Sequence, residues 1–174
     1  MPKIIENVRG QLLAEARRQI ALYGYADTTI RSVAGACGLG VGTVYNYFKS
    51  KEMLIATFIY EDWKKHLEEM ATLPDDSPRE LLGGIFDGLR RFEAENAKLF
   101  SDTEAAKLMA AGFSSRHKIL REQIAAFIVP LCERNRLDAP VLSAEFLAEA
   151  LINWSMDGAE FDAIYPILEK IIKK

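Results

Sequence analysis

Apolar positions recur at helical spacing along almost the whole chain. Val8, Leu12, Ala16, Ile20 and Tyr23 lie three or four residues apart, which predicts a first helix that ends close to the glycine at position 24. No segment alternates apolar and polar positions clearly enough to predict a strand. The pattern therefore predicts an all-α fold.

The next apolar segments are short and are broken by glycine. Thr28 and Thr29 offer an N-cap for a helix of about two turns. Gly38 is well placed to end that helix in the left-handed conformation that glycine adopts without strain. After a tight turn at Leu39 and its neighbour, a third short helix is predicted over residues 41–48.

Six further helices are predicted, most of them longer. Ser50 is expected to cap a long fourth helix, which ends before a Pro- and Asp-rich loop at residues 73–78. The others cover about residues 78–98, 103–111, 115–135, 143–156 and 161–174. Pro130 is expected to kink or break its helix, Ser143 to cap the following one, and Pro166 to mark the true first turn of the last.

Composition and charge divide the chain into two parts. Its 174 residues are 49% hydrophobic and 27% charged, which suits a buried core and argues against disorder. The net charge of −3 hides an uneven distribution, because residues 1–51 carry seven Lys or Arg against three Asp or Glu. A basic first part followed by an acidic remainder indicates two parts with different tasks.

Several kinds of site and location are not expected. The first ten residues are polar, unlike a signal peptide, and no apolar run is long enough to cross a membrane. Cys37 and Cys132 are too few for a disulfide framework or a zinc site, and neither His66 nor His117 has metal-ligating neighbours. We therefore expect no cofactor, no metal and no membrane contact, and we expect a cytoplasmic protein.

Residues 28–48 have the plan of a helix-turn-helix. A helix of two turns, a glycine-containing turn and a second short helix would place that second helix in a DNA major groove about 12 Å wide. Val44 and Phe48 are four residues apart and are expected to face the core. The side chains that remain for the outer face are Thr43, Tyr45, Asn46 and Tyr47.

Several short motifs follow one another over about residues 5–65. They are the paired threonines, the glycine turn, the Gly42-Thr43-Val44-Tyr45 core, the Tyr47-Phe48 pair and the Lys49-Ser50-Lys51-Glu52 segment that begins the fourth helix. In this combination the chain resembles the TetR family of bacterial transcriptional regulators. Gly40 departs from the family pattern, which often has a capping serine there, and Val41 stands at a position that is often polar in relatives.

The resemblance implies a role in DNA binding for individual residues. Arg31 would reach a phosphate or a guanine edge, the start of the third helix would lie against the bases, and the tyrosine hydroxyls would donate to phosphates. Lys51 would hold a phosphate at the positive end of the fourth helix. The full set is Thr29, Arg31, Val41, Gly42, Thr43, Tyr45, Asn46, Tyr47 and Lys51. Each also has an ordinary interpretation, such as a helix cap for Thr29 or a solvated charge for Arg31.

The last two predicted helices carry apolar stripes. We expect them to pair with their copies in a homodimer, whose two-fold symmetry would require a palindromic operator. The residues predicted at this interface are Leu147, Leu151, Ile164, Leu168 and Ile171. The alternative is that these stripes pack only inside their own protomer.

Aromatic and methionine side chains are frequent after residue 66, where no motif of a known family is visible. They suit either core packing or a pocket between helices. The residues predicted to line a pocket are Phe92, Met109, Phe113 and Trp154. The resemblance favours a small, largely apolar effector, and a tilt of the fourth helix is expected to couple its binding to DNA.

The sequence as a whole predicts a ligand-responsive repressor and not an enzyme. We assign DNA binding to residues 1–50, with the motif at about 29–48, and effector binding and dimerisation to residues 51–174. Two alternatives stay open, a helical oligomeric adaptor and an all-α enzyme, both without DNA binding. The enzyme is disfavoured because no nucleophile elbow, phosphate loop, zinc-protease motif or dinucleotide fingerprint is present.

Overall fold

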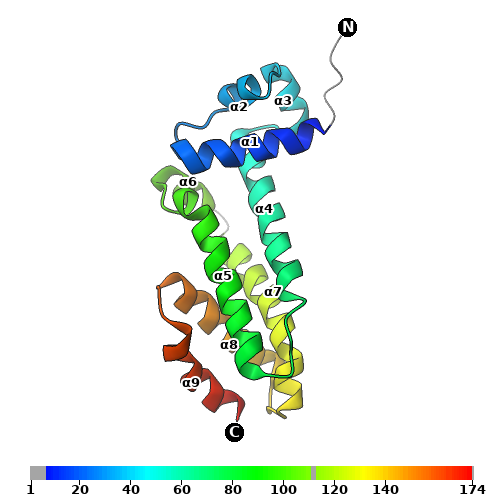
Figure 1. Cartoon of the computed structure of the whole chain (residues 1–174), viewed down its shortest axis with the longest axis vertical. Helices are drawn as coiled ribbons and strands as arrows, with labels where there is room; N and C mark the ends of the chain where they lie inside the picture. Colours follow the sequence, from blue (N-terminus) through cyan, green and yellow to red (C-terminus); the bar gives the residue numbers. More distant parts are fainter. Residues whose placement is uncertain (1–6, 111–112, 174) are drawn as a thin grey trace. The chain divides into compact units, whose positions relative to one another are not determined.

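The computed structural model describes residues 7–110 and 113–173, and in this part all regular secondary structure is helical (Figure 1). The helices are α1 (Val8–Tyr23), α2 (Ile30–Ala36), α3 (Val41–Tyr47), α4 (Lys51–Met70), α5 (Pro78–Phe100), α6 (Thr103–Ala110), α7 (Phe113–Arg134), α8 (Pro140–Met156) and α9 (Phe161–Ile172). The predicted all-α class is confirmed. None of these helices is both long and apolar enough to cross a membrane.

Several helix ends lie at residues whose chemistry explains them. Gly24 follows α1 with φ of 87°, and Gly38 follows α2 with φ of 66°, a conformation that other residues adopt only with strain. The hydroxyl of Ser50 accepts a hydrogen bond from the backbone N–H of Met53 at 3.2 Å, and so caps α4 as predicted.

The structure excludes a break at Pro130 and corrects the predicted roles of Ser143 and Pro166. α7 continues as a helix through Pro130 and is not broken there. α8 begins at Pro140, ahead of Ser143, because proline is favoured in a first turn, where its missing N–H needs no partner. α9 begins at Phe161, so Pro166 lies inside it. Buried apolar side chains on both sides of the two interior prolines hold these helices together despite the lost backbone hydrogen bond.

The chain forms two compact units. The first runs from α1 to Trp63 and adds Asn96–Ala110, and the second combines Lys64–Glu95 with the segment from α7 onwards. α4 and α5 thus each contribute residues to both. The charge pattern indicated a division of function after residue 50. That functional division stays a prediction.

The helices of the first unit share an apolar core. Leu12 and Ala16 from α1, Val33 from α2 and Val44 from α3 belong to it. Ala105 from α6 is buried in the same core, although it is distant in the sequence. The three N-terminal helices are therefore packed by burial of their apolar faces.

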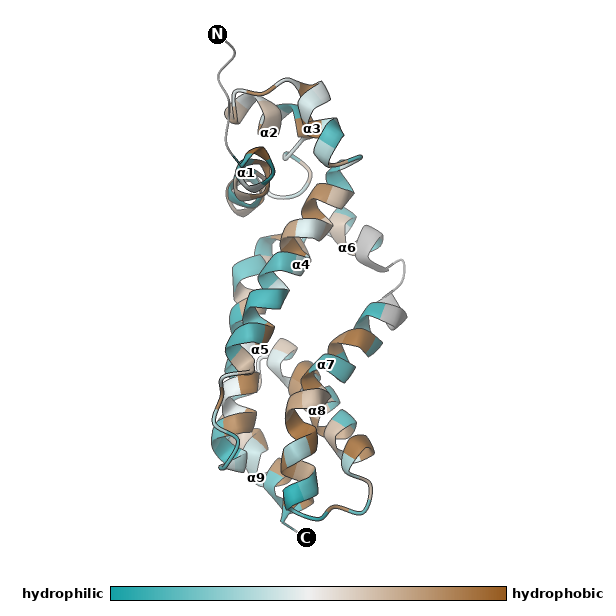
Figure 2. Ribbon diagram, turned by 90° about the vertical axis from the view of Figure 1, so that its right-hand side faces the viewer, coloured by the Kyte–Doolittle hydropathy of each residue, from teal (hydrophilic) through white to brown (hydrophobic). Residues whose placement is uncertain are grey.

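The apolar stripes of α8 and α9 lie inside the second unit, and the ribbon of α8 is largely hydrophobic (Figure 2). Leu147, Leu151 and Leu168 are 0% exposed and Ile164 is 5% exposed, while Ile171 is half-buried. A side chain with no exposed surface in one chain has none left to bury against a second copy. These four side chains are thus covered by their own chain, and the predicted pairing of the last two helices with a second copy stays a prediction.

Candidate DNA interface

The short helix α3 is held to the first unit by one apolar side. Val44 is 0% and Phe48 is 3% exposed, which confirms that both face the core. Val41 and Thr43 are half-buried. The exposed residues of α3 are Gly42, Tyr45, Asn46 and Tyr47. α3 thus presents a polar and aromatic surface to the solvent.

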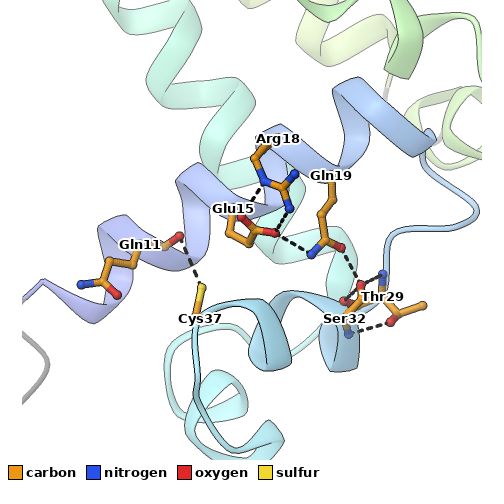
Figure 3. Close-up of polar contacts among 7 residues, drawn as sticks. All are labelled: Gln11, Glu15, Arg18, Gln19, Thr29, Ser32 and Cys37. Carbon is orange, nitrogen blue, oxygen red and sulfur yellow. Dashed lines mark hydrogen bonds and ion pairs between the residues drawn. The ribbon is translucent and has the colours of Figure 1, made fainter. Parts of the chain in front are cut away.

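α2 is fixed at its start by two reciprocal hydrogen bonds. The hydroxyl of Thr29 accepts from the N–H of Ser32, and the hydroxyl of Ser32 accepts from the N–H of Thr29, both at 3.0 Å (Figure 3). Such a capping box satisfies two backbone donors that the helix leaves without partners. Thr29, which the sequence placed among the DNA contacts, therefore also has a structural task.

A chain of side-chain hydrogen bonds links this cap to α1. Ser32 donates to the amide oxygen of Gln19 at 2.6 Å, and the amide nitrogen of Gln19 donates to Glu15 at 2.8 Å (Figure 3). Glu15 also accepts from Arg18, which lowers the pKa of this carboxyl. The chain orients α2 on α1. Sequence reasoning missed it because only folding brings Gln19 and Ser32 together.

The turn between α2 and α3 is closed by backbone hydrogen bonds. The N–H of Leu39 donates to the carbonyl of Ala34 at 2.9 Å. The thiol of Cys37 donates to the carbonyl of Gln11 at 3.7 Å (Figure 3), and its burial raises the pKa of the thiol. α3 then begins at Val41, and its N-cap residue, Gly40, has no side chain to cap it. This agrees with the departure from the family pattern noted in the sequence.

Two cations beside the motif are exposed. Within the described residues the Arg31 side chain makes no hydrogen bond or ion pair. Lys49 is held only loosely, since its ammonium donates to the carbonyl of Tyr45 at 3.4 Å. Both charges are accessible to an anionic partner.

Lys51 is placed differently from a free surface cation. Its ammonium donates to the carbonyl of Tyr25 and lies 3.7 Å from the centre of the Tyr25 ring. Burial lowers the pKa of this lysine. Tyr25 in turn donates to Glu52 at 3.2 Å, and burial together with that carboxylate raises the pKa of the phenol to about 12. Tyr25 carries no spacing signal that would have identified this role.

Two arginines of α1 are neutralised by carboxylates on α4. Arg17 makes two hydrogen bonds to Asp62, at 3.0 and 2.5 Å, and its guanidinium carbon lies 5.4 Å from the centre of the Phe58 ring. Arg9 pairs with Glu61 at 2.7 Å. The positive excess counted over residues 1–51 is therefore smaller in the folded unit, because its partners lie beyond that boundary.

Comparison with known proteins connects this geometry to one family. The family profile described as "Bacterial regulatory proteins, tetR family" matches residues 12–57, which include all of α2 and α3. The HTH-type transcriptional repressor AcnR of Corynebacterium efficiens is 23% identical over 95% of this chain and 90% of its own. The HTH-type transcriptional repressor KstR2 of Mycolicibacterium smegmatis is 33% identical over 49% of this chain and 42% of its own.

The DNA-binding part of the chain belongs to the TetR family. Its fold also matches the crystal structure of a TetR-family transcriptional regulator from Pectobacterium atrosepticum, with a TM-score of 0.63 and 22% identity over 94% of this chain and 88% of the other. TetR proteins are transcriptional regulators that bind DNA and are not enzymes. The enzyme and adaptor alternatives are thereby set aside.

Two of the predicted pocket residues have described side chains, and both belong to the second unit. Phe92 and Trp154 are half-buried, whereas the side chains of Met109 and Phe113 lie outside the described part. No three metal-ligating side chains come together among the described residues. Each histidine instead faces a carboxylate, His66 on Glu95 at 3.1 Å and His117 on Glu149 at 2.9 Å.

Proposed function

We propose that this TetR-family regulator is a repressor that binds a palindromic operator as a homodimer in the cytoplasm and is released by a small, largely apolar effector. The observation that carries the proposal is the α2–turn–α3 unit, which buries Val44 and Phe48 and exposes the polar surface of α3. This unit lies within the segment that matches the TetR profile. The curated relatives AcnR and KstR2 are named as repressors, which supports repression.

The proposed contacts with the operator divide into two kinds. Val41, Gly42 and Thr43, in the first turn of α3, would lie against base edges in the major groove. The exposed hydroxyls of Tyr45 and Tyr47 would donate to phosphates and set the register on the duplex. The remaining proposed contacts are Thr29, Arg31, Asn46 and Lys51.

Lys51 would need to change partners to reach a phosphate. Its ammonium now donates to the carbonyl of Tyr25, so a direct phosphate contact requires that hydrogen bond to break. The start of α4 would still favour an anion at this position through its positive dipole end. We therefore assign Lys51 a double role, in which it holds Tyr25 without DNA and assists phosphate binding with it.

The dimer would use the exposed faces of α8 and α9. Leu142, Phe146 and Met156 are 68%, 60% and 59% exposed and are spaced so that they share one face of α8. Ile167 of α9 is 52% exposed. A second copy of the chain is the proposed occupant of these surfaces, because a palindromic operator is matched by a protein with two-fold symmetry.

The operator contacts can be tested on a duplex selected from random sequences, with affinity measured by fluorescence anisotropy. We expect Tyr47→Phe to weaken binding about equally on all sequences, by about threefold to tenfold, and Thr43→Ala to change the order of preferred sequences. Tyr60→Phe is the matched control, because Tyr60 is an exposed tyrosine of α4 outside the proposed interface. Affinity should fall steeply with salt. Salt-independent binding, or full affinity of Arg31→Ala combined with Lys51→Ala, would refute the proposed interface.

Effector control would act through α4, which runs without interruption from Lys51 to Met70. A ligand changes operator affinity only if it binds one conformation of the dimer more tightly than the other. We expect some compounds from a thermal-shift screen of metabolites to raise the melting temperature by mass action and to lower operator affinity. Compounds that bind the second unit and leave operator affinity unchanged would contradict coupling through α4.

A further inference from the structure

The second unit contains a buried histidine in which only one of the two ring nitrogens has a hydrogen-bond partner among the described residues. His66 of α4 is 5% exposed, and its Nε2 lies 3.1 Å from a carboxylate oxygen of Glu95. Its Nδ1 is buried and has no hydrogen-bond partner among the described residues. Arg121 Nε is the other such atom in the described part, but it lies 3.8 Å from the carboxylate of Glu145.

The contact with Glu95 decides which kind of partner Nδ1 requires. An ionised carboxylate only accepts hydrogen bonds, so it places the ring proton on Nε2. In the neutral imidazole Nδ1 is then left with a lone pair, which makes it an acceptor. A buried acceptor without a donor is unfavourable, because it has lost its bonds to water and gained none in return.

An aromatic side chain borders the ring that carries this acceptor. The ring of Phe92 meets the imidazole edge to face, with 5.6 Å between the ring centres and 75° between the planes. Met70, one turn further along α4, is 2% exposed. In sites for small molecules a few fixed polar atoms beside aromatic side chains set the orientation of the ligand.

We propose that His66 Nδ1 is the hydrogen-bond anchor for an uncharged, apolar ligand that carries a hydroxyl group. The hydroxyl donates its proton to Nδ1, and the apolar body packs against Phe92. A ligand whose polar atoms are all acceptors is rejected, because its lone pair would face that of Nδ1. A charged ligand is disfavoured by the cost of burying its charge. The inference rests on the proposed effector binding and names the chemical class of the effector.

Phenol and toluene form a matched pair of probes for this anchor, since they have nearly the same shape and only phenol donates a hydrogen bond. Their affinities are measured by calorimetry on the full-length protein. We expect His66→Leu to lower the ratio of phenol to toluene affinity about tenfold, while toluene still binds. His117→Leu, which removes the other histidine, should leave the ratio unchanged. Glu95→Leu should also lower the ratio of phenol to toluene affinity, because the proton of the His66 ring is then free to move to Nδ1.

Nitrogen-15 spectra of the imidazole give a second measurement that a purely structural role of His66 would not affect. Phenol should shift the Nδ1 resonance of His66, and toluene should leave it in place. An unchanged affinity ratio in His66→Leu, or no phenol binding to the wild type, would overturn the proposal. Operator affinity is measured separately. If phenol binds through His66 and the operator is not released, the anchor stands and the effector function fails.

Discussion

Replacing Phe146 and Ile167 by glutamate should convert the proposed homodimer into folded monomers and weaken operator binding by more than about a hundredfold. Both side chains are largely exposed in the single chain, at 60% and 52%, so the charges disturb no core. In the dimer they would be buried next to the same charges of the second copy, which is strongly unfavourable. A monomer engages one half-site only and loses the contribution of the second. Sedimentation velocity and fluorescence anisotropy measure the two effects on the same sample.

Two further variants define the interface. Ile119→Glu places a charge at another exposed apolar position, on α7, where Ile119 is 53% exposed, and should leave the dimer intact. Leu151→Glu, at a position with 0% exposure, should unfold the second unit instead of dissociating the dimer. A Phe146→Glu, Ile167→Glu protein that sediments as a dimer would show that α8 and α9 do not form the interface.

Asp62→Ala should destabilise the first unit by about 2 kcal/mol. Asp62 is 8% exposed and receives two hydrogen bonds from Arg17, so its removal leaves a guanidinium without its buried partner. Because the Arg17 side chain is 38% exposed, water compensates part of the loss, and the cost stays below that of a fully buried pair. Urea denaturation followed by circular dichroism measures the change in the free energy of unfolding.

The neighbouring ion pair provides the control for this prediction. Arg9 and Glu61 are 50% and 36% exposed, so Glu61→Ala should cost less than about 1 kcal/mol. The double variant Arg17→Met, Asp62→Leu should recover part of the loss, because no charge is then left without a partner. Equal effects of Asp62→Ala and Glu61→Ala would mean that the bidentate Arg17–Asp62 pair contributes no more to the free energy of unfolding than the exposed Arg9–Glu61 pair.

The sequence predicted the helices and the orientation of α3 well, because both depend on local spacing. Val44 and Phe48 are one helical turn apart, so one face of the short helix had to hold both. The ends at Gly24 and Gly38 were predictable for a similar reason, since glycine there relieves a local backbone constraint. The starts of α8 and α9 were harder to predict. Pro140 occupies the first turn that proline favours, whereas at Pro166, inside α9, packing overrides that preference.

The partner of a buried face was not predictable from spacing. Leu147 and Leu168 lie on apolar stripes, and a stripe shows which side of a helix is buried but not what covers it. The same limit applies to charges. Arg17 counted toward a basic first part, but its partner Asp62 is 45 residues away and only the fold brings the two together. The Lys51–Tyr25 contact was missed for the same reason.

The weak internal support of α3 has a consequence for how the regulator distinguishes sequences. This helix has seven residues, no side-chain cap at Gly40, a second glycine at position 42 and one fully buried side chain, Val44. Its free energy of local opening should therefore be low compared with that of longer, better buried helices. A duplex that fits α3 both contacts it and orders it, whereas a poorly fitting duplex must meet the same entropic cost with fewer contacts. Discrimination between operators would then arise partly from the ordering of the recognition helix itself.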